Sequence, residues 1–133
     1  MEIKTIGIIG AGQMGGGIAQ VAAQKGFTVL LADITEEIAR KGFSKIDAGL
    51  KKLVEKGKIA DADREVTMSR IKVAWNVDEF RDADFIIEAI IENENIKKEL
   101  LQKIDSIVRP EVIIASNTSS ISITRLGAAT RRA

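Results

Sequence analysis

The sequence predicts an α/β domain built on a doubly wound, mainly parallel sheet. Three observations lead to this expectation: short apolar, β-branched runs alternate with segments of helical periodicity, the runs are apolar on both faces, and glycines crowd the junction between the first run and the first helix. Strands that are buried on both faces are typical of parallel sheets covered by helices on either side. The 133 residues suffice for one domain with its own core.

The first three expected elements are a strand, a helix and a second strand. The run Ile3–Ile9 is short and β-branched, as in a buried strand. A helix is expected at 13–25, ended by Gly26, and its apolar residues recur at helical spacing at Met14, Ile18, Val21 and Ala22. Phe27–Ala32 is expected to form the second buried strand, which ends directly before Asp33.

A helical hairpin is expected over about residues 36–70. Its first helix runs from Thr35 to about Gly57, where apolar residues at spacings of three and four stand among many charges: Ala39, Phe43, Ile46, Leu50 and Leu53. Its second helix is Asp61–Ser69. The remaining expected elements are strands at Ile71–Trp75 and Phe85–Ile91, a helix at Glu94–Val108 and a strand at Val112–Ala115, with Pro110 between the last two.

The composition argues against several classes of function. Twenty basic and nineteen acidic residues nearly balance, and only 4% of residues are aromatic, so we expect no nucleic-acid partner. With no cysteine and no histidine, the chain is expected to hold neither a disulfide nor a metal, which fits a cytoplasmic setting. The uncharged stretch 5–24 has the length of a membrane span, but its glycines and glutamines argue against a membrane role.

The segment IGIIGAGQMGGGIAQ, residues 6–20, contains a G-x-G-x-x-G pattern directly after the first strand. Its glycines are Gly10, Gly12 and Gly15, and Gln13 and Met14 lie between the last two. In a dinucleotide-binding turn of the Rossmann type, these glycines allow a tight bend, close approach of a pyrophosphate, and close packing of helix on strand. The positive end of the helix then faces the phosphates. The five residues are therefore expected to bind a cofactor, although glycine-rich turns also occur in α/β proteins without ligands.

Asp33 indicates which cofactor this is. It ends the second strand 18 residues after the last glycine of the pattern, where a carboxylate can accept hydrogen bonds from an adenosine ribose. The alternative is that Asp33 caps the following helix, although Thr35 can serve as that cap. A phosphate on the ribose would meet the charge of Asp33, and Ile34, Glu36 and Glu37 offer it no positive partner. The expected cofactor is NAD and not NADP.

Four stretches together resemble a known family: GAGQMGGGIAQVAAQKGFTVLLAD, the charged helical pair at 36–70, DFIIEAIIENENIKKELLQKID and IIASNTSSISIT. They are similar to the NAD-binding domain of the L-3-hydroxyacyl-CoA dehydrogenases, in particular the bacterial 3-hydroxybutyryl-CoA type. The resemblance covers essentially all 133 residues. It implies an oxidoreductase that exchanges hydride between NAD and a short-chain 3-hydroxyacyl-CoA, in fatty acid or butanoate metabolism, and a full-length parent that is a homodimer.

The resemblance also implies roles for particular residues. Ser119 matches the serine that hydrogen-bonds the substrate's 3-oxygen, and Asn117 matches a residue beside the nicotinamide ribose. Glu92 and Lys97 match residues at the nicotinamide end of the cofactor, and Lys56 matches a lysine at the adenosine phosphate end of coenzyme A. Without the family, the segment SNTSS is a polar loop that caps a helix, and both lysines are solvated helix charges.

One departure from the family concerns catalysis. Relatives use a histidine as general acid and base, followed by a helical dimerisation domain, and this chain contains no histidine. We therefore expect residues 1–133 to be the NAD-binding domain alone, able to bind NAD but with little or no dehydrogenase activity. Two alternatives stay open: a stand-alone NAD-binding module, and a dehydrogenase of a small hydroxy acid without CoA.

Overall fold

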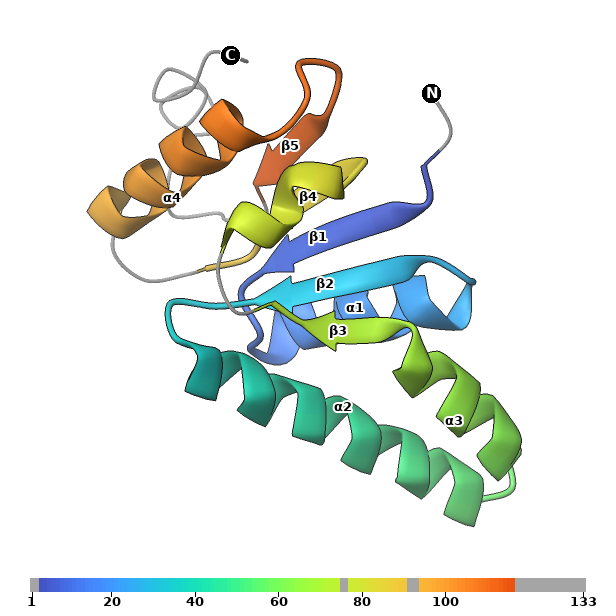
Figure 1. Cartoon of the computed structure of the whole chain (residues 1–133). Coiled ribbons are helices and arrows are strands. Elements are labelled where there is room, and N and C mark those ends of the chain that lie inside the picture. Colours follow the sequence, from blue (N-terminus) through green and yellow to red (C-terminus); the bar gives the residue numbers. More distant parts are fainter. Residues whose placement is uncertain (1–2, 75–76, 91–93, 117–133) are drawn as a thin grey trace.

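The computed structural model describes residues 3–74, 77–90 and 94–116. They form one parallel sheet with the strand order β3-β2-β1-β4-β5 (Figure 1). The strands are β1 (Thr5–Ile9), β2 (Thr28–Ala32), β3 (Ile71–Val73), β4 (Phe85–Glu88) and β5 (Ile113–Ser116). The helices are α1 (Gln13–Gln24), α2 (Glu36–Glu55), α3 (Asp61–Ser69) and α4 (Glu94–Ile107), with a short 3₁₀ helix η1 (Val77–Asp82). The predicted doubly wound parallel sheet is thus confirmed.

Within the described residues, the core consists of two hydrophobic clusters, one on each face of the sheet. Successive residues of a strand point to opposite faces, so Ile8 belongs to the cluster beneath α1 and α2, whereas Ile9 belongs to the cluster beneath η1 and α4. In β2, Leu31 and Leu30 divide in the same way. These four side chains are at most 8% exposed, which confirms that β1 and β2 are buried on both faces.

Helix α1, at the place predicted for the first helix, packs closely on the sheet. Its buried residues are small: Gly15, Gly16, Ala19, Ala22 and Ala23. The larger Met14 and Val21, which supported the predicted helix, are each 51% exposed. The helix was predicted correctly, and of the apolar residues that indicated it, Ala22 is buried and Ile18 packs partly buried against the core. Small residues let α1 approach β1 more closely than long side chains would.

One predicted strand ends earlier than expected, and one short helix was not expected. The predicted strand Phe85–Ile91 ends at Glu88, whose fully buried carboxylate accepts a hydrogen bond from the backbone N–H of Ile90 and so turns the chain out of the ladder. The helix η1 was not predicted. Trp75 and Ile91, the ends of two expected strands, lie outside the described residues. No helix in the described ranges has both the length and the apolarity that a membrane span requires.

Asp84 links the start of β1 to the residues around β4 at the amino edge of the sheet. Its Oδ2 accepts hydrogen bonds from the backbone N–H groups of Lys4 and Thr5, both at 2.9 Å, and its Oδ1 pairs with Arg109. The two backbone donors, together with Arg109, hold the pKa of the Asp84 carboxyl below its usual value despite partial burial. The start of β1 is thereby tied to β4 and to the turn that follows α4.

Candidate functional site

The glycine turn between β1 and α1 is shaped by close contacts. Gly10 has a φ of +118°, and a Cβ there would lie 2.7 Å from the carbonyl carbon of Ala89. A Cβ on Gly15 would lie 1.6 Å from the carbonyl oxygen of Gly10. Around Gly12, by contrast, a Cβ would have no atom within 4 Å. The first and third glycines are thus required by packing, and the second keeps the space above the turn open.

The amino end of α1 is suited to an anion. Its N-cap is Gly12, which has no side chain to accept a hydrogen bond from the first turn, and that turn contains no acidic residue. The first N–H groups of a helix together with its dipole favour a negatively charged group such as a diphosphate. A cofactor with phosphates therefore fits this end of the helix.

Asp33 joins the end of β2 to the glycine turn. Its Oδ2 accepts a hydrogen bond from the Ala11 N–H at 2.7 Å, and its Oδ1 accepts one from the Ile34 N–H at 2.6 Å. The cap of α2 is Thr35, whose Oγ1 accepts a hydrogen bond from the Ile38 N–H at 3.2 Å, so the alternative in which Asp33 caps the helix is wrong. A carboxylate has about four lone-pair positions, so Asp33 retains acceptor capacity for ribose hydroxyls.

These residues line one cleft of about 640 Å³ at the carboxyl edge of the sheet, which we call the glycine-loop cleft. Its lining residues are Gly10, Gly12, Gln13, Met14, Asp33, Ile34, Ile38, Ala89 and Ile90. The structure thus brings together five of the predicted cofactor residues, whereas Gly15 is buried at the base of the turn. Ligands of open α/β sheets bind at this edge.

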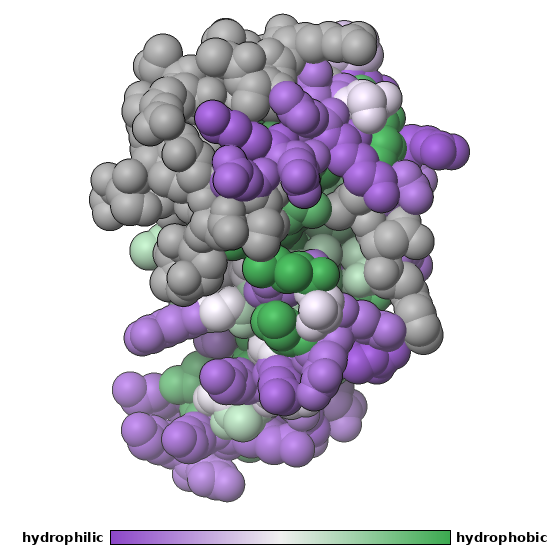
Figure 2. Space-filling model, turned by 90° about the vertical axis from the view of Figure 1, so that its left-hand side faces the viewer, coloured by the Kyte–Doolittle hydropathy of each residue, from purple (hydrophilic) through white to green (hydrophobic). Residues whose placement is uncertain are grey.

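One wall of the glycine-loop cleft is apolar. Met14, Ile34 and Ile38 are between 42% and 51% exposed, which is unusual for side chains of this size. Figure 2 looks onto this side of the molecule and shows an apolar area at its centre, with hydrophilic side chains below it. Such a wall suits the flat face of an adenine. Ile34, Ile38, Ala89 and Ile90 were not among the residues predicted for the site, although the position of Ile38 outside the buried stripe of α2 was a usable signal.

The other predicted residues are not placed in this cleft. Lys56 is exposed at the carboxyl end of α2, at the end of the hairpin away from the carboxyl edge of the sheet (Figure 1). Lys97 belongs to α4, but its side chain is outside the described part of the structure. Glu92, Asn117 and Ser119 lie outside the described residues altogether. Their expected roles remain predictions.

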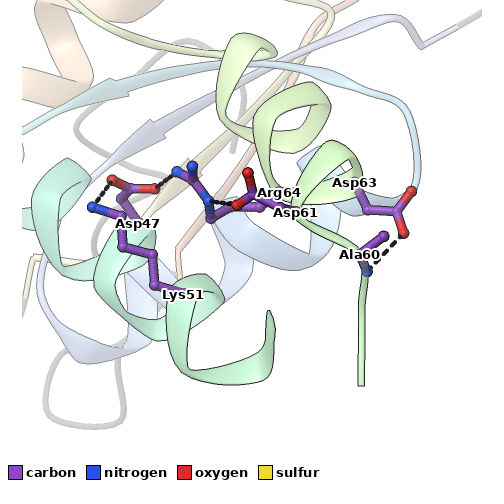
Figure 3. A network of polar contacts seen from close by, with 6 residues as sticks. All are labelled: Asp47, Lys51, Ala60, Asp61, Asp63 and Arg64. Atoms are coloured by element: carbon purple, nitrogen blue, oxygen red, sulfur yellow. Dashed lines mark hydrogen bonds and ion pairs between the residues drawn. The ribbon is translucent and has the colours of Figure 1, made fainter. Parts of the chain in front are cut away.

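The two helices of the hairpin are joined by a network centred on Arg64 (Figure 3). Its Nη1 donates to Asp47 of α2 at 2.7 Å and its Nε to Asp61 of α3 at 2.8 Å, while Lys51 lies 3.4 Å from Asp47. Burial alone would raise the pKa of Asp47, but the hydrogen bond from Arg64 and the charge of Lys51 outweigh it and lower that pKa. At the start of α3, Asp63 accepts a hydrogen bond from the Ala60 N–H.

Comparisons with known proteins agree on one family. Residues 5–133 match the family described as "3-hydroxyacyl-CoA dehydrogenase, NAD binding domain". The chain is 51% identical, over 126 residues, to a probable 3-hydroxybutyryl-CoA dehydrogenase of Deinococcus radiodurans; the match covers 95% of this chain and 45% of that protein. It is 41% identical to the fatty acid oxidation complex subunit alpha of Psychrobacter cryohalolentis, covering 98% of this chain and 18% of that protein.

Solved structures show the same likeness. The crystal structure of (S)-3-hydroxybutyryl-CoA dehydrogenase from Ralstonia eutropha superimposes with a TM-score of 0.93 at 45% identity, covering 98% of this chain and 46% of that one. The chain therefore spans about half the length of the Deinococcus radiodurans and Ralstonia eutropha proteins.

Proposed function

We propose, because this chain belongs to the family of 3-hydroxyacyl-CoA dehydrogenase NAD-binding domains, that it is the cofactor-binding part of an enzyme acting on short-chain 3-hydroxyacyl-CoA. In this reaction hydride passes between NAD and the carbon that bears the 3-hydroxyl group. The observation that carries the proposal is the glycine-loop cleft, in which an uncapped helix end, Asp33 and an apolar wall face one another.

Different residues of the glycine-loop cleft bind different parts of NAD. The amino end of α1, beyond Gly12, takes the diphosphate; Asp33 accepts hydrogen bonds from the adenosine ribose; Ile34 and Ile38 cover the adenine. Bound NAD supplies the nicotinamide carbon that accepts or returns hydride. Because the Asp33 carboxylate would meet a ribose phosphate with like charge, the cleft prefers NAD to NADP.

The remaining site residues extend the proposal toward the substrate. Glu92 and Lys97 belong at the nicotinamide end, Asn117 at its ribose, and Ser119 at the substrate's 3-oxygen, by their match to the family's motifs. Residues 1–133 form the NAD-binding domain in this proposal, and they contain no histidine to move the proton of the hydroxyl. We therefore expect this chain to bind NAD and to turn over little or no substrate.

The names of relatives and the amino-acid composition support a proposal for the pathway and the cell compartment. We place the enzyme in butanoate and fatty acid metabolism, because relatives are named 3-hydroxybutyryl-CoA dehydrogenase and fatty acid oxidation complex subunit alpha. The absence of cysteine fits the cytoplasm. The longer parent protein is expected to be a homodimer, as the resemblance implies.

The first test is a fluorescence titration of the chain with NADH and, separately, with NADPH, in which Trp75 can serve as an energy donor. We expect saturable binding of NADH and much weaker binding of NADPH. A folded sample that binds neither would contradict the cofactor assignment.

A second titration, with acetoacetyl-CoA, tests the substrate class. Lys56→Glu is expected to weaken binding, whereas the same change at Lys58, an exposed neighbour with no assigned role, serves as the control. Equal affinities of the two variants would favour a substrate without CoA or an NAD-binding module.

A further inference from the structure

Helix α2 packs closely against the glycine turn at Gly42. Gly42 is buried, and a Cβ there would lie 2.4 Å from the carbonyl oxygen of Ala11 and 2.5 Å from the Cβ of Ala11. Real Cβ atoms essentially never approach other atoms so closely, so the backbone of α2 packs directly on the turn. This contact joins the helical hairpin to the loop that precedes α1.

Ala11 is the central residue of that turn and is held from two directions. Its N–H donates to Asp33 Oδ2 at 2.7 Å on the cleft side, and Gly42 covers its Cβ and carbonyl oxygen on the other, leaving Ala11 4% exposed. Ala11 connects Gly10 to Gly12, so any shift of Ala11 moves the start of α1 as well. A side chain at position 42 would push Ala11 and disturb its bond to Asp33.

We propose that Gly42 is a positioning residue for NAD: the absence of a side chain lets α2 hold Ala11 where the turn and Asp33 face the cofactor. Gly42 does not line the glycine-loop cleft, and all the atoms that a Cβ there would meet most closely belong to Ala11. The inference rests on the proposed function, since it names a second layer of that same binding site.

Helix α2 supplies a matched control in Gly49. A Cβ at Gly49 would have its nearest atom, Gln20 Oε1, at 3.9 Å, which is an ordinary van der Waals distance. Gly42→Ala and Gly49→Ala add the same methyl group within the same helix and gain the same helix propensity. They differ in that only the first meets the turn.

The experiment measures NADH affinity and thermal stability of the wild-type chain, Gly42→Ala and Gly49→Ala. Gly42→Ala is expected to lose about tenfold or more in NADH affinity. This is the size of effect that follows when a displaced Asp33 makes a weaker charged hydrogen bond to the ribose. Gly49→Ala is expected to bind NADH as the wild type does. Amide spectra should show the Ala11 and Ile34 N–H signals shifted in Gly42→Ala and unmoved in Gly49→Ala.

A general loss of stability is separated from positioning by Ile104→Val, which alters a fully buried residue of α4 on the opposite face of the sheet. This variant should melt earlier and bind NADH normally. If Gly42→Ala does not fold, Ala11→Gly is titrated instead, because it deletes the Cβ on which Gly42 packs and adds no atom at position 42. It should bind NADH more weakly than the wild type, and wild-type affinity would overturn the positioning role.

The outcomes distinguish the inference from the function on which it rests. A wild-type chain that does not bind NADH overturns both. A wild-type chain that binds NADH, with Gly42→Ala binding equally well, overturns the positioning role alone. An affinity loss in Gly42→Ala no greater than that in Ile104→Val, at an equal loss of thermal stability, overturns it as well.

Discussion

Replacing Asp33 by asparagine separates the two tasks that the structure gives to this carboxylate. Asp33 accepts hydrogen bonds from the N–H groups of Ala11 and Ile34 through different oxygens. An asparagine retains one acceptor oxygen and so leaves one of these donors unpaired. A hydrogen bond to a charged group contributes about 1.5–3 kcal/mol, so we expect a loss of about 2 kcal/mol in the free energy of unfolding. For a domain of this size, this lowers the melting temperature by about 6–10 °C.

The same substitution changes cofactor selection. Two like charges 4 Å apart repel by about 4 kcal/mol at an effective dielectric of 20, and salt screening reduces this figure. Removing the charge of Asp33 is therefore expected to decrease the ratio of the NADPH dissociation constant to the NADH dissociation constant by about 100-fold. NADH itself should bind about tenfold more weakly, because its ribose loses a charged acceptor. Both values come from parallel fluorescence titrations.

Asp84→Asn is the matched control for this prediction. Asp84 also accepts two backbone hydrogen bonds, from Lys4 and Thr5, but at the opposite edge of the sheet. The Asp84→Asn variant should be less stable than the wild type and keep the wild-type ratio of NADPH to NADH affinity. An Asp33→Asn protein that melts early but keeps that ratio would refute the ribose contact and leave Asp33 with a purely structural task.

Two further predictions follow from the depressed carboxyl pKa values. Because the pKa of Asp84 is lowered in the folded state, its contribution to stability is present above the unfolded pKa of about 3.9 and is lost as the pH falls through the lower, folded pKa. Urea unfolding from pH 7 to pH 3 should therefore show a shallower acid decline in Asp84→Asn, and an unchanged decline would contradict this assignment. Arg64→Met should lower the melting temperature and raise the pKa of Asp47, measured by NMR titration, because Asp47 loses the hydrogen bond that joins α2 to α3. An Asp47 pKa that does not move would show that Lys51 sets it.

Sequence patterns predicted those parts of the site that depend on neighbouring residues. The spacing of Gly10, Gly12 and Gly15 follows from sterics within a single turn, and the structure shows the close contacts of the first and third. The parallel sheet follows from apolar runs that alternate with helical segments, whereas the order of its strands was not predicted. Asp33 was predicted as a ligand of the ribose, but its bond to Ala11, 22 residues away, depends on how the ends of β1 and β2 meet.

Other parts depend on distances that no sequence pattern states. Hydrophobic spacing at Met14 and Val21 helped to indicate helix α1, yet both side chains are exposed and small residues are buried against the sheet, because the packing of helix on strand is limited by side-chain size and not by hydrophobicity. The end of β4 depends on one side chain, since the buried carboxylate of Glu88 takes the N–H that the ladder would otherwise use. In sequence, Gly42 differs little from Gly49, and only the approach of α2 to Ala11 distinguishes them.

The turn around Ala11 therefore serves the fold and the site with the same atoms. The bond from Ala11 to Asp33 holds β2 against the glycine turn, and it also fixes the carboxylate that is expected to meet the ribose. A change at Gly42 or Asp33 will therefore alter stability and affinity together, and a loss of NADH binding alone cannot assign a residue to the cofactor. The ratio of NADPH to NADH affinity can assign a residue to the cofactor. Both titrations use the same folded fraction of the protein, so the effect of that fraction on the two affinities cancels in the ratio. A substitution that changes this ratio affects a residue that faces the ribose phosphate. A substitution that changes both affinities equally affects a residue that positions the turn.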